Sequence, residues 1–179
     1  STCIGVLTKG FVPSEDGPKL ILETLESVLP EVYKKSLVYI AGPSHAEEVA
    51  MGKLTGLIAA SENPKNSIRF RELLKVPGLM VYSSLDVIGV QICAAAKNVM
   101  GIAAGLLDGY NFSSLKGGLM ARGAREISRL IKACGGNEFS AYGLCLSRMA
   151  FYGIDDLSKI GDAIDKIYSR LKDKVGYED

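Results

Sequence analysis

VIGVQICAAAKNVMGIAAGLLDG, residues 87–109, divides the chain into two parts of different character. The stretch is long and apolar enough to cross a bilayer, since about 20 residues suffice. However, Gln91, Lys97 and Asn98 lie near its centre, where a lysine costs roughly 2.5–3.5 kcal/mol on membrane insertion. With Asp86 as N-cap and Asp108-Gly109 as the stop, we predict a buried helix over 87–107 in a soluble protein.

Before this helix, short apolar runs alternate with helical patterns. Residues 19–29, opened by Gly17-Pro18, and the segment after Asn63-Pro64 show helical signals. The predicted strands are 3–8, 37–42, 54–61 and 79–84. Strands that alternate with helices predict part of an open α/β sheet.

After the long helix, the pattern is helical throughout. The predicted helices are roughly 114–134, 139–152 and 156–174. The last has an apolar stripe at helical spacing, formed by Leu157, Ile160, Ile164, Ile167 and Leu171. We therefore expect two domains, 1–85 and 86–179, packed against each other.

Charge and cysteine content bound the function classes. The 21 basic and 20 acidic residues leave a net charge of +1 without long blocks of one sign, so neither nucleic acid nor an anionic membrane is the expected partner. Four cysteines without a CxxC pair and a single histidine predict free thiols in a reducing cytosol and no metal site. No signal peptide is expected, because the N-terminus begins with a strand-like segment.

Lys97 is the strongest candidate for chemistry. An unpaired ammonium is costly to bury, so Lys97 must meet a partner, a cleft or water. A lysine that snorkels to the edge of the bundle is the structural alternative. With Asn98 beside it and the small residues Ala94 and Gly101 one turn away on either side, a cleft-lining lysine that protonates or polarises an oxygen is favoured.

Lys9 is the second candidate for chemistry. It follows a predicted strand and precedes Gly10, so it is expected at the carboxyl end of a sheet strand, where open α/β sheets bind ligands. An exposed turn residue is the alternative. Two lysines directed at one crevice would suit a polar, anionic small molecule. Ser44 and Glu47 have the spacing of a capping box, which needs no functional explanation.

Four segments, in order and spacing, resemble the NAD(P)-dependent glycerol-3-phosphate dehydrogenases. They are TKG (8–10), AGPSHAEEVA (41–50), AAAKNVMGIAAGLLDG (94–109) and GLMARGAREISRL (118–130). The corresponding family signatures read KG, GPSFAxEV, ALKNVxAIAAGxxDG and RGLxEM. The resemblance covers residues 3–140, and the KNV…AAG…DG block is its most specific part.

The resemblance implies an α/β fold, the second half of a Rossmann-like sheet followed by an all-helical substrate domain. It implies hydride transfer between NAD(P)H and dihydroxyacetone phosphate or glycerol 3-phosphate. Lys97 matches the family's general acid/base and Lys9 a second active-site lysine. Asn98 matches the asparagine after the first lysine, and Ala46 lies where the backbone approaches the nicotinamide. A small phosphorylated substrate, a cytoplasmic location and self-association into a homodimer are further expectations.

Two departures from the family pattern qualify these expectations. The chain contains no GxGxxG, the loop that normally holds a dinucleotide pyrophosphate, so we expect a truncated or divergent member that is inactive in isolation. After Gly136, the GDL aspartate and the phosphate-holding Arg-Asn pair of the family are not matched.

The choice between NAD and NADP as the cofactor stays open. The alternatives are a non-catalytic helical dimerisation or binding module and a related small hydroxy-acid dehydrogenase.

Overall fold

The computed structural model describes residues 2–44 and 46–145. These residues belong to one compact unit, Ser1–Met149, and a second unit follows at Ala150–Asp179. The predicted helix at 156–174 and the end of the one at 139–152 lie outside the described residues. The division at residue 85 stays a prediction.

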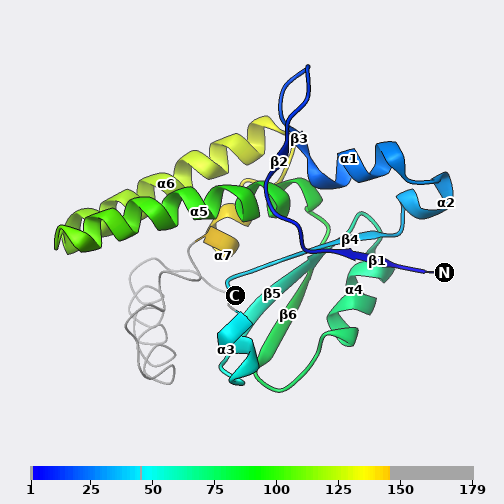
Figure 1. Ribbon diagram of the computed structural model, residues 1–179, viewed down its shortest axis with the longest axis horizontal. Coiled ribbons are helices and arrows are strands. Elements are labelled where there is room, and N and C mark those ends of the chain that lie inside the picture. Colours follow the sequence, from blue (N-terminus) through cyan, green and yellow to red (C-terminus); the bar gives the residue numbers. More distant parts are fainter. Residues whose placement is uncertain (1, 45, 146–179) are drawn as a thin grey trace, which may run out of the picture. The chain divides into compact units, whose positions relative to one another are not determined.

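A four-stranded mixed sheet forms the first part of the chain (Figure 1). Its order is β1 (Ile4–Val6), β4 (Leu37–Ala41), β5 (Thr55–Ala60) and β6 (Leu79–Ser84). The β1–β4 and β5–β6 pairs are parallel, whereas β4 and β5 are antiparallel. All four strands were predicted, with ends within two residues. The apolar runs in the sequence did not reveal that β4 and β5 are antiparallel.

A small hairpin interrupts the first crossover. β2 (Phe11–Val12) pairs antiparallel with β3 (Lys19–Leu20), and Gly17 in the turn has a φ of 110°. The prediction of a helix directly after Pro18 was therefore wrong for its first two residues. Lys19 and Leu20 form β3, and Leu20 pairs with Phe11 before α1 (Ile21–Val28) begins. A further one-turn helix, α2 (Glu31–Lys34), precedes β4.

The sheet is covered on both faces, and β4 is buried along its whole length. Alternate side chains of a strand point to opposite faces. Tyr39 and Ala41 accordingly join the core under α1 and α5 (Val87–Gly109), while Val38 and Ile40 pack in a second cluster with Phe70. Phe70 belongs to α4 (Pro64–Leu73), whose N-cap is Asn63. β4 is thus the most constrained strand of the sheet.

The long helix α5 begins as expected after Asp86, whose carboxylate accepts a hydrogen bond from the Gly89 amide at 2.9 Å. It continues to Gly109, two residues beyond the predicted end. Gln91, 2% exposed, accepts a hydrogen bond from the Leu22 amide at 2.9 Å. Because helix N-termini leave backbone N–H groups unsatisfied, Gln91 supplies from α5 the cap that α1 lacks locally.

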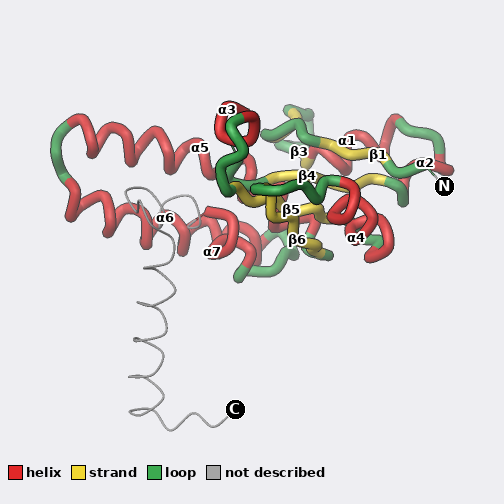
Figure 2. Tube along the Cα trace, turned by 90° about the horizontal axis from the view of Figure 1, so that it is seen from below, coloured by secondary structure: helices red, strands yellow, loops and turns green. Residues whose placement is uncertain are grey.

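α5 and α6 (Ser113–Ala133) run side by side as an antiparallel pair (Figures 1 and 2). Lys116 and Asp108 form an ion pair at 2.7 Å near the turn between them. Small residues on α5 do not by themselves mark the contact, because open space surrounds Gly101 and Gly105 while Ala104 is buried. The pair approaches closely instead at Gly123, where Met100 fills the place of a side chain.

The last described helix, α7 (Ser140–Cys145), packs against α5 and α6. Asp86 joins the two regions, because its carboxylate accepts hydrogen bonds from the Asn137 amide at 3.1 Å and from the Ser140 hydroxyl. The chain therefore returns from α6 to the start of α5.

Among the described helices, α5 alone has the length and composition to cross a bilayer. Within this fold its first half is a core helix instead, with Val90, Ile92 and Cys93 at most 1% exposed against the sheet.

Candidate active site

The side chain of Lys97 reaches back from α5 to the sheet. Its Nζ donates a hydrogen bond to the carbonyl oxygen of Gly42 at 2.8 Å, and the residue is half-buried. Gly42 is the residue immediately after β4. The ammonium thus lies at the carboxyl end of the central strand, where a ligand is expected in an open α/β sheet.

Lys9 belongs to the same edge of the sheet. β1 and β4 are parallel neighbours, and their last register pair is Val6 with Tyr39. Lys9 and Gly42 each follow three residues after this pair, so the topology carries both to the carboxyl ends of adjacent strands. Lys9 is exposed, and Gly10 after it turns the chain with a φ of 123°. The topology thus assigns both lysines to one sheet edge, and their convergence on one crevice stays a prediction.

Ala46 and Asn98 are both exposed. Ala46 is the first residue of α3 (Ala46–Ala50), four residues after Gly42, and so follows the same strand end. Asn98 is the neighbour of Lys97 on α5, but successive residues of an α-helix lie about 100° apart. The two side chains therefore leave the helix in different directions. His45 lies outside the described residues.

Gly42 is the site residue that sequence reasoning missed. The sequence predicts it only as the last residue of the strand 37–42, whereas its carbonyl holds Lys97. The available signal was a Gly-Pro pair directly after a wholly apolar strand, which indicates a backbone position with no room for a side chain.

The arginines of the second half, which by residue type could contact a phosphate, are not gathered at one place by the described structure. Arg129 is paired with Glu126 on the surface of α6 at 3.4 Å, and Arg122 and Arg125 are exposed on the same helix. Arg148 lies outside the described residues. No group of three or more metal-ligating side chains occurs within residues 2–44 and 46–145.

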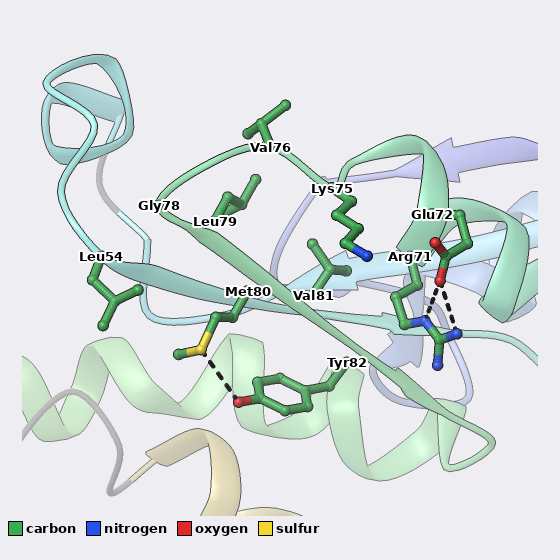
Figure 3. Close-up of a pocket in the computed structure, with 10 residues that line it drawn as sticks. All are labelled: Leu54, Arg71, Glu72, Lys75, Val76, Gly78, Leu79, Met80, Val81 and Tyr82. Atoms are coloured by element: carbon green, nitrogen blue, oxygen red, sulfur yellow. Dashed lines mark hydrogen bonds and ion pairs between the residues drawn. The ribbon is translucent and has the colours of Figure 1, made fainter.

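Two pockets in the described part of the chain lie away from Lys9 and Lys97. The larger, about 530 Å³, borders the edge strand β6 and the end of α4 (Figure 3). Its charged groups include Arg71 and Glu72, which already pair with each other at 2.8 Å, and its walls are mainly apolar. The second, about 280 Å³, lies between α1, α2 and α5. Neither contains Lys9 or Lys97, so size alone does not locate the chemistry.

Comparison with known proteins identifies the family. Residues 2–67 match the family model for the NAD-dependent glycerol-3-phosphate dehydrogenase N-terminus, and residues 86–173 match the model for its C-terminus. The chain belongs to this dehydrogenase family. The resemblance of the KNV…AAG…DG block is thereby confirmed, and the C-terminal match extends past residue 140.

Individual relatives are named after the same dehydrogenase activity as the family models. The chain is 57% identical over 142 residues to the glycerol-3-phosphate dehydrogenase [NAD(P)+] of Treponema denticola, covering 74% of this chain and 39% of the relative. The glycerol-3-phosphate dehydrogenase [NAD(P)+] of Treponema pallidum (strain Nichols) is 54% identical over 142 residues, which again cover 74% of this chain and 39% of the relative. The chain therefore spans about two fifths of the length of these curated relatives.

The fold has a counterpart among solved structures. Glycerol-3-phosphate dehydrogenase from Coxiella burnetii superposes with a TM-score of 0.73 at 28% identity, covering 99% of this chain and 61% of that one. The prediction of a Rossmann-like sheet followed by helices is confirmed.

Proposed function

We propose that this chain is part of an oxidoreductase that moves a hydride between a nicotinamide dinucleotide, NAD or NADP, and dihydroxyacetone phosphate or glycerol 3-phosphate. The observation that carries the proposal is the 2.8 Å hydrogen bond that holds the Lys97 ammonium at the carboxyl edge of the sheet, the edge to which Lys9 also belongs. The relatives at 54–57% identity bear this activity in their names.

The chemistry requires a group that handles the oxygen at carbon 2. When a ketone is reduced, negative charge develops on that oxygen, and an ammonium beside it stabilises the charge and then donates a proton. In the reverse direction, the amine of Lys97 takes the hydroxyl proton. A bound nicotinamide would supply or accept the hydride at the adjacent carbon.

Lys9 would add a second positive charge facing the substrate. An ammonium on an exposed turn can pair with a phosphate or with the keto oxygen. Asn98 would bind a substrate hydroxyl from its own direction on α5. These roles rest on the family match of each residue and on the shared sheet edge of Lys9 and Lys97.

The described residues fit the nicotinamide end of the cofactor. Ala46 presents a small, exposed side chain just beyond β4, which leaves room for a planar ring at that edge. The sequence holds no GxGxxG loop for the pyrophosphate, so the residues described here would contact only one end of the dinucleotide.

The decisive experiment replaces Lys97 in this chain joined to the dinucleotide-binding half of the Treponema denticola relative. Lys97→Ala should lower kcat/KM for dihydroxyacetone phosphate and NADH by at least ~10²-fold, as for loss of a general acid. Lys75→Ala, an exposed lysine at the pocket beside β6, should change it less than about twofold. Circular dichroism checks that both variants fold. Turnover of Lys97→Ala within tenfold of the parent contradicts the proposal.

Ligand binding to the chain itself separates the remaining alternatives. A ligand that binds the folded state at 100 times its Kd stabilises by about 2.7 kcal/mol, which is visible as a rise in melting temperature. We expect glycerol 3-phosphate to raise the melting temperature and an unphosphorylated hydroxy acid to leave it unchanged. The reverse pattern favours a hydroxy-acid dehydrogenase, and no shift with either favours a non-catalytic module.

We also infer a cytoplasmic location. Within the described residues, Cys3, Cys93 and Cys134 form no disulfide, which fits a reducing compartment. The proposed partner is a small phosphorylated molecule, with neither nucleic acid nor membrane involved.

A further inference from the structure

The residue whose carbonyl holds Lys97 has no room for a side chain. Gly42 is buried and directly follows the wholly buried strand β4, whose last register pair with β5 joins Ala41 and Ile58. A Cβ atom on Gly42 would lie 2.3 Å from the Gly56 carbonyl oxygen and 2.8 Å from the Leu57 Cα. Both are backbone atoms of a neighbouring strand, so they cannot move aside as a flexible side chain would.

The other end of the contact is equally constrained. Lys97 lies one turn after Cys93, and Ile92 and Cys93 are 1% and 0% exposed in the core beneath α5. Gln91 joins the same helix to the first turn of α1. The Cα of Lys97 is therefore placed by core packing, and its Nζ is placed by the Gly42 carbonyl.

We propose that Gly42 is a positioning residue, whose carbonyl oxygen sets the location of the Lys97 ammonium and whose missing side chain lets β5 hold that carbonyl in place. The inference rests on the proposed function, because the location matters only if Lys97 transfers a proton. The Gly-Pro turn after β4 would then position Lys97 in addition to reversing the chain.

Adding a methyl group at Gly42 has a specific consequence. The backbone must move away from β5, and the carbonyl oxygen moves with it. A displacement of about 1 Å in a group that positions a reacting atom can cost on the order of 10²-fold in rate. Since Gly42→Ala leaves Lys9 at the sheet edge to bind the substrate, the loss should fall on kcat and not on KM.

Gly56→Ala is the matched control. Gly56 belongs to β5, the strand whose backbone Gly42 approaches, but its added Cβ would meet only the Met80 carbonyl oxygen, at 4.0 Å. The two variants thus make the same chemical change in the same part of the sheet, one against a rigid backbone and one into ordinary van der Waals contact.

The first experiment needs no activity and uses the chain itself. Acylation of lysine amines by a water-soluble ester, read by mass spectrometry, reports how accessible each Nζ is. In the parent, Lys97 should react at least about tenfold more slowly than the exposed Lys9. Gly42→Ala should raise the Lys97 rate several-fold and leave Lys9 unchanged, whereas Gly56→Ala should change neither. Equal rates for Lys97 in the parent and in Gly42→Ala would overturn the proposal.

The second experiment measures turnover in the joined enzyme described above. We expect Gly42→Ala to lower kcat by at least about tenfold with KM for dihydroxyacetone phosphate within twofold. In a Lys97→Met background, Gly42→Ala should lower kcat no further, because the group that it positions is gone. An additive loss would show that Gly42 acts elsewhere and would refute the inference.

The two readouts keep this inference apart from the proposed function. If the acylation rates behave as expected but Lys97→Ala retains full turnover, the contact exists and the proposed function fails, which also removes the positioning role. If Lys97→Ala abolishes turnover but Gly42→Ala does not, the function stands and the positioning role fails. Should Gly42→Ala not fold, the parent alone decides, since Lys97 reacting as fast as Lys9 contradicts the contact.

Discussion

Tyr39 shows at the residue scale how tightly the centre of the sheet is packed. Its side chain is 0% exposed under α5, and its hydroxyl has no hydrogen-bond partner among the described residues. Burial raises the pKa of Tyr39 to about 12. A buried hydroxyl without a partner costs free energy, so Tyr39 stabilises the core through its ring.

We predict that Tyr39→Phe leaves the free energy of unfolding unchanged or raises it by up to about 3 kcal/mol. Because the pKa in the folded state lies above the unfolded value of about 10, the contribution of the neutral Tyr39 side chain to stability is fully present below pH 10 and is lost as the pH rises from about 10 to about 12. Urea unfolding between pH 8 and pH 12 measures the difference between parent and variant, which should widen only above pH 10.

Tyr33→Phe is the control for this test, since Tyr33 is 37% exposed. It should change the unfolding free energy by less than about 0.5 kcal/mol. A loss of more than 1 kcal/mol in Tyr39→Phe would indicate a hydrogen-bond partner for the hydroxyl and contradict the argument.

At the scale of elements, two helix caps with the same local role differ in what else they hold. Asn63 caps α4 by accepting from the Lys65 amide at 3.1 Å, at the surface. Asp86 caps α5 and in addition accepts from the Asn137 amide and the Ser140 hydroxyl. The second cap therefore fixes the segment between α6 and α7 to the beginning of α5.

We predict that Asp86→Ala destabilises the chain at least twice as much as Asn63→Ala. Loss of a cap alone costs about 1 kcal/mol, and hydrogen bonds to a charged acceptor add about 1.5–3 kcal/mol. Equilibrium unfolding in urea provides both values under one set of conditions. Equal costs for the two variants would mean that the contacts to Asn137 and Ser140 contribute nothing.

At the scale of the whole molecule, the α5–α6 pair presents an apolar outer face near its turn. Its exposed side chains are Val99, Ile102, Leu106, Tyr110, Phe112 and Leu115. Tyr110 and Phe112 stack with ring centroids 6.0 Å apart. Large apolar side chains exposed at helical spacing on one element, such as Val99, Ile102 and Leu106, are the kind of surface that marks an interaction site or an aggregation hazard.

We predict that the chain in isolation associates through this face, which would account for the expected homodimer. Ile102 is 69% exposed, so Ile102→Glu should shift sedimentation velocity profiles toward the monomer without lowering the urea midpoint. Val32→Glu, at a residue 75% exposed on α2, should leave association unchanged. A chain that sediments as a monomer at all concentrations, or that responds equally to both variants, contradicts this role of the face.

Local sequence determined most of the elements. The four strands, the Asp86 cap and the start of α5 follow from apolar runs, capping residues and Gly or Pro at their ends, because these signals act within a few residues along the chain. The family could also be recognised from Lys97 and its small neighbours on one helix. The hairpin before α1 escaped prediction, because pairing across the turn prevailed over the helical pattern after Pro18.

Tertiary structure alone decided where these elements meet. The antiparallel order of β4 and β5, the Gln91 cap on α1 and the Lys97 contact with Gly42 each join residues distant in the sequence. No local preference encodes such pairs, because each depends on how whole elements pack around a shared core. The sequence thus determined that Lys97 needs a partner, and the packing of α5 against the end of β4 determined which partner it has.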